Sequence, residues 1–244
     1  MRPDDLWLRP DWQAPQVAAF MTTRGLNYGR KAGDAESVRA NRAALAPVLG
    51  ARPVFLDQVH GADVVTLQPD WHDDNAPRAD AAVSTDPELA VAILVADCLP
   101  VLFAAPGGVA GAHAGWRGLA AGVLENTVAA LCARAGCEPR DVKAWLGACI
   151  GPTAFEVGPE VVAAFGREAL PQDQPGFLYR PNPEPRWRAD LPLLARERLK
   201  EAGVTEISGG TWCTVTDDSR FFSFRGEALG RPRGRMAACI AWRG

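Results

Sequence analysis

The sequence of 244 residues has little histidine, little lysine and no surplus of basic over acidic residues. It holds 3 histidines and 26 basic against 29 acidic residues, for a formal net charge of −3. Three of the cations are lysines (Lys31, Lys143 and Lys200), so arginine supplies almost all of the positive charge. Because there is no basic excess, the composition does not support binding to nucleic acid or to an acidic membrane surface.

Long apolar runs and paired cysteines are missing as well. The most apolar stretch, 89–105, is interrupted by Asp97 and Pro100 and is too short to span a bilayer. No apolar segment follows the basic start of the chain, so we expect no signal peptide. The 6 cysteines form no C-x-x-C pair, which is typical of reduced thiols in such a chain. We therefore expect a cytoplasmic protein without a disulfide framework.

Several catalytic motifs are also absent. The glycines between 107 and 118 do not fit G-x-G-x-x-G, and neither G-K-[S/T] nor G-x-S-x-G occurs. The zinc-deaminase pattern of H-x-E followed by P-C-x-x-C is missing too. These absences argue against a dinucleotide fold, a P-loop, a serine-hydrolase elbow and the usual type of zinc deaminase.

The apolar residues, 48% of the chain, follow both strand and helix periodicities. Short apolar runs separated by Pro and Gly predict strands, and apolar residues four positions apart predict a helix. Strands are expected at 53–58, 63–67, 79–84, 89–95, 101–105, 109–113, 142–149, 206–208, 212–215 and 235–242. Helices are expected at about 34–45, 118–135, 159–170 and 190–203, and the segment 171–188, with five prolines, as a loop. These elements predict one mixed α/β domain over 1–244.

Two of the three histidines stand at the ends of predicted strands. His60 and His113 each precede a turn, and between them Asp97 and Cys98 interrupt an apolar run. Two imidazoles and one thiolate are the ligand set of a catalytic zinc site with an open position. Strand ends at one sheet edge bring such groups together. The residue types alone favour a simpler alternative, in which the strand-end histidines and a small buried cysteine are structural.

Several segments resemble the YfiH-type family, whose members have been called laccase-domain or polyphenol oxidase proteins and purine nucleoside phosphorylases. The most specific matches are Ala96-Asp97-Cys98-Leu99-Pro100 and Ala114-Gly115-Trp116-Arg117-Gly118. The others, in family order, are Gln58-Val59-His60-Gly61-Ala62-Asp63-Val64, Ile150-Gly151-Pro152, Phe155-Glu156-Val157-Gly158, Phe222-Ser223-Phe224-Arg225 and Gly234-Arg235-Met236-Ala237. Together they cover nearly the whole chain.

This resemblance implies a single-domain α/β sandwich of layered, mixed sheets with flanking helices. It also implies a zinc ion (Zn²⁺) held by His60, Cys98 and His113, with copper (Cu²⁺) possible in its place. The implied reaction is phosphorolysis of adenosine, inosine and S-methyl-5′-thioadenosine to the free base and a ribose 1-phosphate. Deamination of adenosine to inosine is implied as a second activity. The expected partners are therefore a purine nucleoside and phosphate.

Catalytic roles are predicted for Asp97, Glu156 and Arg117. Either carboxylate is a candidate proton donor for deamination, although a structural ion pair or a helix cap explains each equally well. Arg117 lies where the long predicted helix starts, so its guanidinium and the helix N-terminus could share a phosphate. The alternative for Arg117 is an ion pair at the surface.

Substrate-binding roles are predicted for Arg24, Asn27, Gln58 and Arg225. Gln58 lies two residues before His60 on the same strand face and could orient a ligand, or could be an ordinary strand residue. Arg225 lies at a predicted Phe-rich strand end. The loop between Arg24 and Asn27 is shorter here than is usual in the family. Substrate range and rate could therefore differ from those of the family.

Three other functions are considered. Some relatives are described as peptidoglycan editing factors, which predicts amide hydrolysis on a UDP-muramoyl precursor, with Cys98 as nucleophile and His113 as base or with zinc driving the step. A multicopper oxidase needs roughly ten histidines and this chain has 3, so copper-dependent polyphenol oxidation is at most a side activity. A non-enzymatic binding module does not explain Asp97, Cys98 and Pro100 within a core run.

Overall fold

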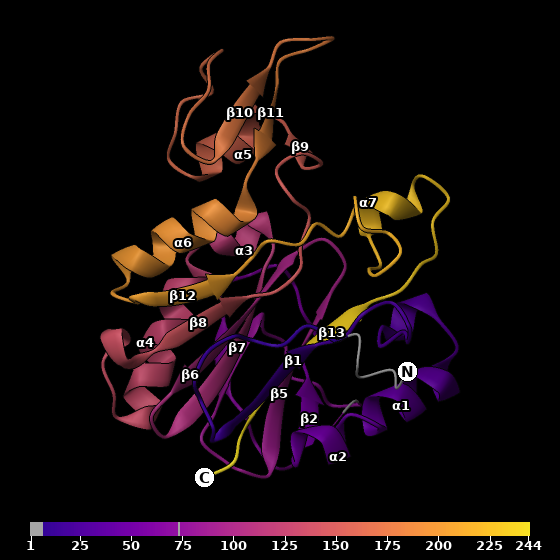
Figure 1. Ribbon diagram of the computed structural model, residues 1–244, viewed down its shortest axis with the longest axis vertical. Helices are drawn as coiled ribbons and strands as arrows, with labels where there is room; N and C mark the ends of the chain where they lie inside the picture. The colour runs from indigo at the N-terminus through magenta and orange to yellow at the C-terminus, as the bar shows by residue number, and fades with distance from the viewer. Residues whose placement is uncertain (1–6, 73) are drawn as a thin grey trace.

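Two mixed β-sheets packed face to face form the centre of the computed structural model, which describes residues 7–72 and 74–244 (Figure 1). The larger sheet has the order β12-β8-β6-β7-β4-β3. Its strands are β3 (Val64–Thr66), β4 (Ala81–Ser84), β6 (Leu99–Ala105), β7 (Gly108–Ala114), β8 (Lys143–Leu146) and β12 (Glu206–Gly209). The smaller sheet, β1-β13-β5-β2, contains β1 (Val17–Met21), β2 (Arg52–Phe55), β5 (Leu89–Val95) and β13 (Met236–Trp242).

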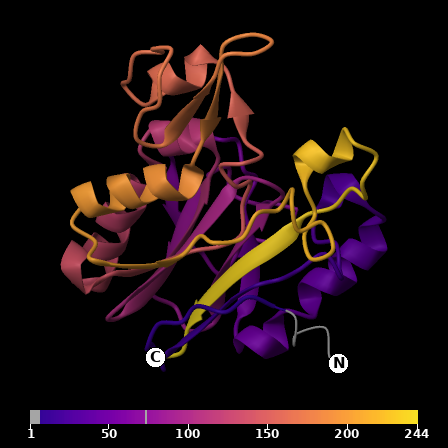
Figure 2. The same ribbon diagram turned by 45° about the horizontal axis from the view of Figure 1, so that its top comes forward.

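Helices cover the outer faces of both sheets (Figure 2). The larger sheet packs against α3 (Trp116–Ala120), α4 (Val123–Ala135) and α6 (Leu191–Glu201), and α5 (Pro159–Ala164) lies beside α3. The smaller sheet packs against the segment that contains α1 (Ala35–Ala43) and α2 (Ala46–Leu49). The other helices in the described residues are α7 (Phe224–Glu227) and the short 3-10 helices Arg30–Ala32 and Pro139–Asp141. This arrangement confirms the predicted α/β sandwich of mixed sheets with flanking helices.

Alternation of side chains along the strands builds the two faces of the smaller sheet. On β5, Val91 and Ile93 point into the core between the sheets, whereas Ala90 and Ala92 pack on the α1–α2 side. This period of two is the strand geometry that directs successive side chains to opposite faces. The sheets approach each other closely at Gly111, where an added Cβ would lie 2.9 Å from a methyl carbon of Val91.

The helix predicted over 118–135 is two helices, α3 and α4. Gly122 separates them with a φ of +91°, a conformation that glycine adopts without steric cost. The apolar spacing continues across the break and therefore hides it. The predicted caps are confirmed: Asp34 accepts a hydrogen bond from the Ser37 amide at the start of α1, and Asp190 accepts one from the Leu193 amide in α6.

The region expected as a proline-rich loop is instead part of a third, small sheet. Its strands are β9 (Glu156–Val157), β10 (Phe177–Arg180) and β11 (Arg186–Ala189), in the order β10-β11-β9, and it protrudes beyond the two main sheets in Figure 1. The hairpin forms because the prolines flank the strands and fill the connection at 181–185 rather than interrupting the pairing. The ring centroids of Tyr179 and Trp187 lie 5.5 Å apart across it.

Other elements also differ from expectation. Helix α5 ends at Ala164 rather than near Leu170. The predicted strand 212–215 is only an isolated bridge between Cys149 and Cys213. Strand β1 was not predicted and pairs with β13 in the antiparallel sense. Within the described residues, no helix has the length and apolar character needed to cross a membrane.

The sheet register brings distant residues to one end of the sandwich. In the antiparallel β6–β7 pair, Pro100 lies opposite His113, so Cys98 just before β6 reaches the end of β7. In the β4–β7 pair, Ala81 lies opposite Ala112, which places Asp80 beside the same end. The loop after β2 adds His60.

Candidate metal centre and its pocket

His60, Cys98 and His113 form a cluster, called the ligand cluster below. One potential ligand atom from each residue lies within 4.8 Å of the others. The sulfur of Cys98 is 3.9 Å from Nε2 of His60, and the two imidazole rings meet edge to face with centroids 4.8 Å apart. His113 is buried, Cys98 is half-buried and His60 is exposed. The cluster could therefore hold a metal ion on its open side, which is how a catalytic rather than a structural site is built.

Asp80 fixes two members of the cluster. Its fully buried carboxylate accepts a 2.8 Å hydrogen bond from Nδ1 of His113. It also accepts hydrogen bonds from the backbone amides of Val59, His60 and Gly61, at 3.1, 2.9 and 2.7 Å. The bond at Nδ1 leaves Nε2 of His113 for a ligand, which is the carboxylate–histidine pairing found beside metal ions.

The electrostatics of the cluster favour a thiolate. Burial raises the pKa of the Cys98 thiol, but hydrogen bonds and positive charge from His113 and His60 outweigh burial and lower that pKa to about 6. Burial lowers the pKa of His113, yet Asp80 and Cys98 raise it to about 9. Burial also raises the pKa of Asp80, whereas bonds from His113 and Gly61 hold it below its ordinary value. Thiolate is the form of cysteine that binds metals.

Two glycines allow the chain to close around the cluster. A Cβ at Gly115 would lie 3.1 Å from the Cys98 sulfur and 3.2 Å from Cδ2 of His60. A Cβ at Gly118 would lie 2.6 Å from the carbonyl oxygen of Gly61, next to His60 in the chain. A larger residue at Gly118 would force the backbone at Gly61 to shift, whereas one at Gly115 would require Cys98 and His60 to move by a few tenths of an ångström.

Backbone strain also concentrates here. In the described part of the chain, the non-glycine residues with positive φ are His60, at +64°, and Asp97, at +84°. One is a member of the ligand cluster and the other precedes a member. Such conformations persist only where surrounding contacts hold them, and they gather at functional sites.

A pocket of about 450 Å³ opens over the ligand cluster. Segments from both ends of the chain enclose it: Gly29–Ala32 and Arg42 from one side, and Phe224, Arg233 and Arg235 from the other. Five of its lining side chains are cationic and two, Asp57 and Asp97, are acidic. These cations form what we call the cationic wall: Arg30, Lys31, Arg42, Arg233 and Arg235.

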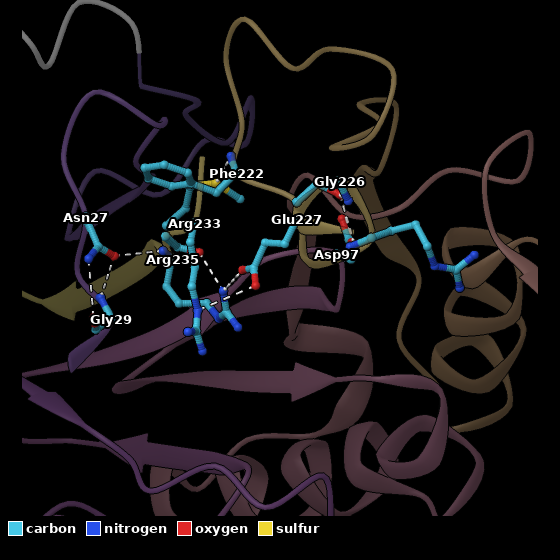
Figure 3. Close-up of polar contacts among 12 residues, drawn as sticks. Asn27, Gly29, Asp97, Phe222, Gly226, Glu227, Arg233 and Arg235 are labelled. Carbon is cyan, nitrogen blue, oxygen red and sulfur yellow. Dashed lines mark hydrogen bonds and ion pairs between the residues drawn. The ribbon is translucent and has the colours of Figure 1, made fainter. Parts of the chain in front are cut away.

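Glu227 organises part of the cationic wall (Figure 3). Its carboxylate lies 2.8 Å from the Arg235 guanidinium and 3.5 Å from that of Arg233. The Asn27 side-chain oxygen accepts hydrogen bonds from the amides of Gly29 and Arg235, both at 2.9 Å, and so joins the N-terminal segment to the C-terminal one. One carboxylate facing two guanidinium groups leaves net positive charge at the pocket.

Among the predicted catalytic residues, Asp97 lines the pocket but both of its carboxylate oxygens are engaged. Oδ1 accepts a 2.5 Å bond from the Thr214 hydroxyl, and Oδ2 accepts bonds from the Ser223 hydroxyl at 3.0 Å and the Arg225 amide at 2.6 Å. Glu156, exposed on β9, and Arg117, exposed on α3 with its guanidinium 4.3 Å from the Trp116 ring, are not among the residues lining the pocket.

Of the predicted substrate-binding residues, Gln58 lines the pocket, and its amide exchanges two 2.8 Å hydrogen bonds with the backbone of Leu94. Asn27, Arg24 and Arg225 are not among the lining residues. Asn27 bonds to backbone, and Arg24 donates to the carbonyl of Asp218. Arg225 lies in α7, not at a strand end, with its guanidinium 6.0 Å from the Phe155 ring.

Sequence reasoning missed Asp80 and the C-terminal arginines. Asp80 is a charged residue at the start of a buried strand, the same signal that singled out Asp97. Arg231, Arg233 and Arg235 alternate with Pro and Gly in a chain without basic excess, so their clustering was a signal as well.

The fold and the site together define a family of α/β sandwich proteins with a possible His/Cys/His metal site. A family model described as multi-copper polyphenol oxidoreductase laccase matches residues 18–243, and the chain belongs to this family. The chain is 46% identical to a purine nucleoside phosphorylase of Pseudomonas aeruginosa, over 96% of this chain and 97% of that protein. It is 42% identical to the purine nucleoside phosphorylase YfiH of Escherichia coli, over 95% of this chain and 96% of that protein. The family assignment made from sequence motifs is thus confirmed.

Solved structures agree with the fold. A Neisseria meningitidis protein of the family DUF152 superposes with a TM-score of 0.85 at 38% identity, over 98% of this chain and 99% of that one. The Bacillus licheniformis protein YfiH superposes with a TM-score of 0.81 at 29% identity, over 93% of each chain. The naming of the curated relatives supports an enzyme that acts on small molecules.

Proposed function

We propose that the protein is a zinc-dependent purine nucleoside phosphorylase with adenosine deamination as a second activity. The observation that carries this proposal is that the ligand cluster lines the same pocket as the cationic wall. Phosphorolysis forms a bond between a phosphate oxygen and C1′ of the ribose, and the bond between C1′ and the base breaks. Such a reaction needs an anion site beside the nucleoside, and this pocket offers one.

The donor set fits zinc. Two imidazoles and one thiolate suit this ion and leave a fourth position open. His60, Cys98 and His113 would hold it, with Asp80 orienting His113. When bound, zinc supplies a Lewis acid and lowers the pKa of water at its open position.

The residues of this chain bind and orient the anion. The cationic wall is suited to phosphate because arginine donates paired, charge-assisted hydrogen bonds to its oxygens. Glu227 holds the Arg235 guanidinium in place before phosphate arrives. Arg117 was predicted for this role, and we now favour Arg233 and Arg235 because they line the pocket.

The proposal is tested by product analysis. Purified protein is incubated with adenosine, with and without inorganic phosphate, and adenine, inosine and ribose 1-phosphate are separated. We expect phosphate-dependent adenine, and inosine without phosphate, both lost in His60→Ala and Cys98→Ala. Leu229→Ala, a change at an exposed leucine outside the pocket, serves as the matched control. Adenosine that survives incubation with zinc-loaded wild-type protein would contradict the proposal.

One observation favours a second candidate, amide hydrolysis of a UDP-muramoyl precursor. Asp80, His113 and Cys98 are arranged as an acid, a base and a nucleophile, and the Cys98 pKa of about 6 is that of an activated thiol. Metal distinguishes the candidates, because a cysteine that binds zinc is not free to form an acyl-enzyme. Hydrolysis of the precursor by metal-free protein would support the thiol route.

Copper chemistry would rest on the same cluster. The family model carries a multi-copper description, but the chain has 3 histidines and two of them are in this cluster. Copper in place of zinc would therefore be a single-ion site, and we propose oxidation of phenols as a side activity at most.

A further inference from the structure

We propose that Phe224 is the platform on which the purine base stacks, and that Asp97 positions this platform relative to the ligand cluster. This inference rests on the proposed function and specifies where the base lies within the same pocket. It also gives Asp97 a positioning role instead of a proton-transfer role.

Phe224 is an aromatic side chain that is exposed to solvent. Its exposed fraction is 62%, and it lines the pocket that contains His60, Cys98 and His113. An aromatic face is apolar and accepts any purine, because every base has a π-face to stack on it. Stacking would remove from water a ring that the folded chain leaves exposed.

The backbone around Phe224 is fixed on both sides. The Ser223 hydroxyl and the Arg225 amide both donate to Oδ2 of Asp97, at 3.0 and 2.6 Å. The Ser223 hydroxyl also accepts a 2.9 Å bond from the Gly226 amide and so caps α7. A surface phenylalanine without a function would not need a buried carboxylate to hold both of its neighbours.

Asp97 connects the segment that carries Phe224 to the ligand cluster. It directly precedes Cys98, is 8% exposed, and keeps a φ of +84° that is unfavourable for a residue with a Cβ. Its other oxygen accepts a bond from the Thr214 hydroxyl, so both carboxylate oxygens are engaged in holding neighbouring segments. Because one residue joins Cys98 to the segment 223–225, the distance between platform and ligand cluster is set by the fold.

The position of Arg235 next to Phe224 indicates where the phosphate would lie relative to the base. The Arg235 guanidinium lies 5.9 Å from the Phe224 ring centroid and is paired with Glu227. A base on Phe224 and a phosphate on Arg235 would therefore lie close together, with the ribose C1′ at which they exchange between them. This places recognition of the base on α7 and of the anion at Arg235, just before β13.

The test measures binding of two probes to zinc-loaded protein by calorimetry. Inosine carries the base, and without phosphate it cannot undergo phosphorolysis. Ribose 1-phosphate lacks the base. We expect Phe224→Ala to weaken inosine binding about tenfold or more, in line with about 1–3 kcal/mol for stacking of one base. Ribose 1-phosphate binding should stay within about twofold, and Phe224→Trp should restore inosine binding.

Two matched variants separate the platform from general damage. Leu229→Ala removes another exposed apolar side chain of the same segment, 68% exposed and outside the pocket, and should change neither affinity. Ser223→Ala removes one bond to Asp97 without altering any residue next to Cys98, and should weaken inosine more than ribose 1-phosphate at unchanged zinc content. Equal weakening of both probes in Phe224→Ala, or none in either, would overturn the inference.

Failure of this inference differs from failure of the proposed function. If wild-type protein cleaves inosine with phosphate but Phe224→Ala binds inosine normally, the platform is wrong and the phosphorylase stands. If wild-type protein cleaves no nucleoside yet binds inosine through Phe224, the platform stands and the phosphorylase is wrong. If wild-type protein neither binds nor cleaves inosine, both are wrong.

Discussion

The two sides of the pocket are built in opposite ways. The ligand cluster depends on a buried carboxylate that accepts four hydrogen bonds, on glycines that admit close packing and on the β6–β7 register. On the other side, Phe224, Arg30, Lys31 and Arg233 are exposed, Arg235 is half-buried and Arg42 is buried, and Glu227 and Asp97 organise part of this side. Groups that hold a metal must be fixed in position, whereas groups that recognise substrate can be exposed until substrate covers them. Mutations on the two sides should therefore differ in kind as well as in size.

The largest effect is expected for Asp80→Asn. The amide cannot accept all four hydrogen bonds, so His113 loses its fixed orientation and the backbone at 59–61 loses an acceptor. We expect metal affinity to fall about 10–100-fold. The free energy of unfolding should fall by about 3–5 kcal/mol, because a buried pair is broken. Chelator competition and urea unfolding measure the two effects.

Asp57→Asn is the matched control for that change. Asp57 is an exposed carboxylate in the same pocket, and its substitution should leave metal affinity and stability near wild-type values. An Asp80→Asn protein that retains zinc as well as Asp57→Asn does would show that the buried carboxylate does not organise the cluster.

The next effect tests the packing of α3 against the His60 loop. In Gly118→Ala the new Cβ would lie 2.6 Å from the Gly61 carbonyl oxygen, so the loop must shift. We expect metal affinity to fall about tenfold and stability to fall by about 1–3 kcal/mol. Helix propensity alone predicts the opposite sign for stability. Gly25→Ala, where a Cβ meets nothing within 4 Å, is the control, and equal metal affinity in both variants would refute the packing argument.

A smaller effect distinguishes two predicted phosphate sites. Arg235→Gln removes a cation of the wall, and we expect the KM for phosphate to rise about tenfold, since a charged hydrogen bond is worth about 1.5–3 kcal/mol. Arg117→Gln should leave that KM within about twofold, because Arg117 does not line the pocket. Steady-state kinetics at saturating inosine measures both, and the reverse result would restore the helix N-terminus as the anion site.

The smallest effect is expected for a substitution outside both sides of the pocket. Asp190→Ala removes the N-cap of α6, and we expect a loss of about 1 kcal/mol in the free energy of unfolding. Zinc content and the KM for both substrates should stay unchanged. A change in zinc content would mean that α6 is coupled to the ligand cluster through the sheet.

Much of the central fold could be predicted because its strands are short, buried and apolar. Strands β5, β6 and β7 are mainly apolar runs punctuated by Pro and Gly, and the periodicity of α6 is bounded by Asp190 and Gly203. The break at Gly122 was missed because the apolar spacing continues across it. The β10–β11 hairpin was missed because proline content conceals two strands that themselves contain no proline. The single-domain organisation over 1–244 stays a prediction.

The metal centre was predicted only in part from residue types. Two strand-end histidines and one cysteine were visible in the sequence, but their separations of 38 and 15 residues match no motif, and the family resemblance was needed to favour zinc. The 15-residue separation has a simple origin, because Cys98 and His113 flank one hairpin. The contacts of Asp97 and the pairing of Glu227 with two arginines depend on tertiary structure and leave no periodicity in the sequence.

The most direct test of the central claim is to locate the metal itself by anomalous diffraction at the zinc edge from crystals of zinc-loaded protein. We predict one peak per chain, at about 2.0–2.3 Å from the Cys98 sulfur and from one ring nitrogen each of His60 and His113. In Cys98→Ala crystals that peak should disappear together with phosphate-dependent release of adenine. A peak elsewhere in the molecule, or undiminished adenine release by protein without the peak, would contradict a metal centre built on these three residues.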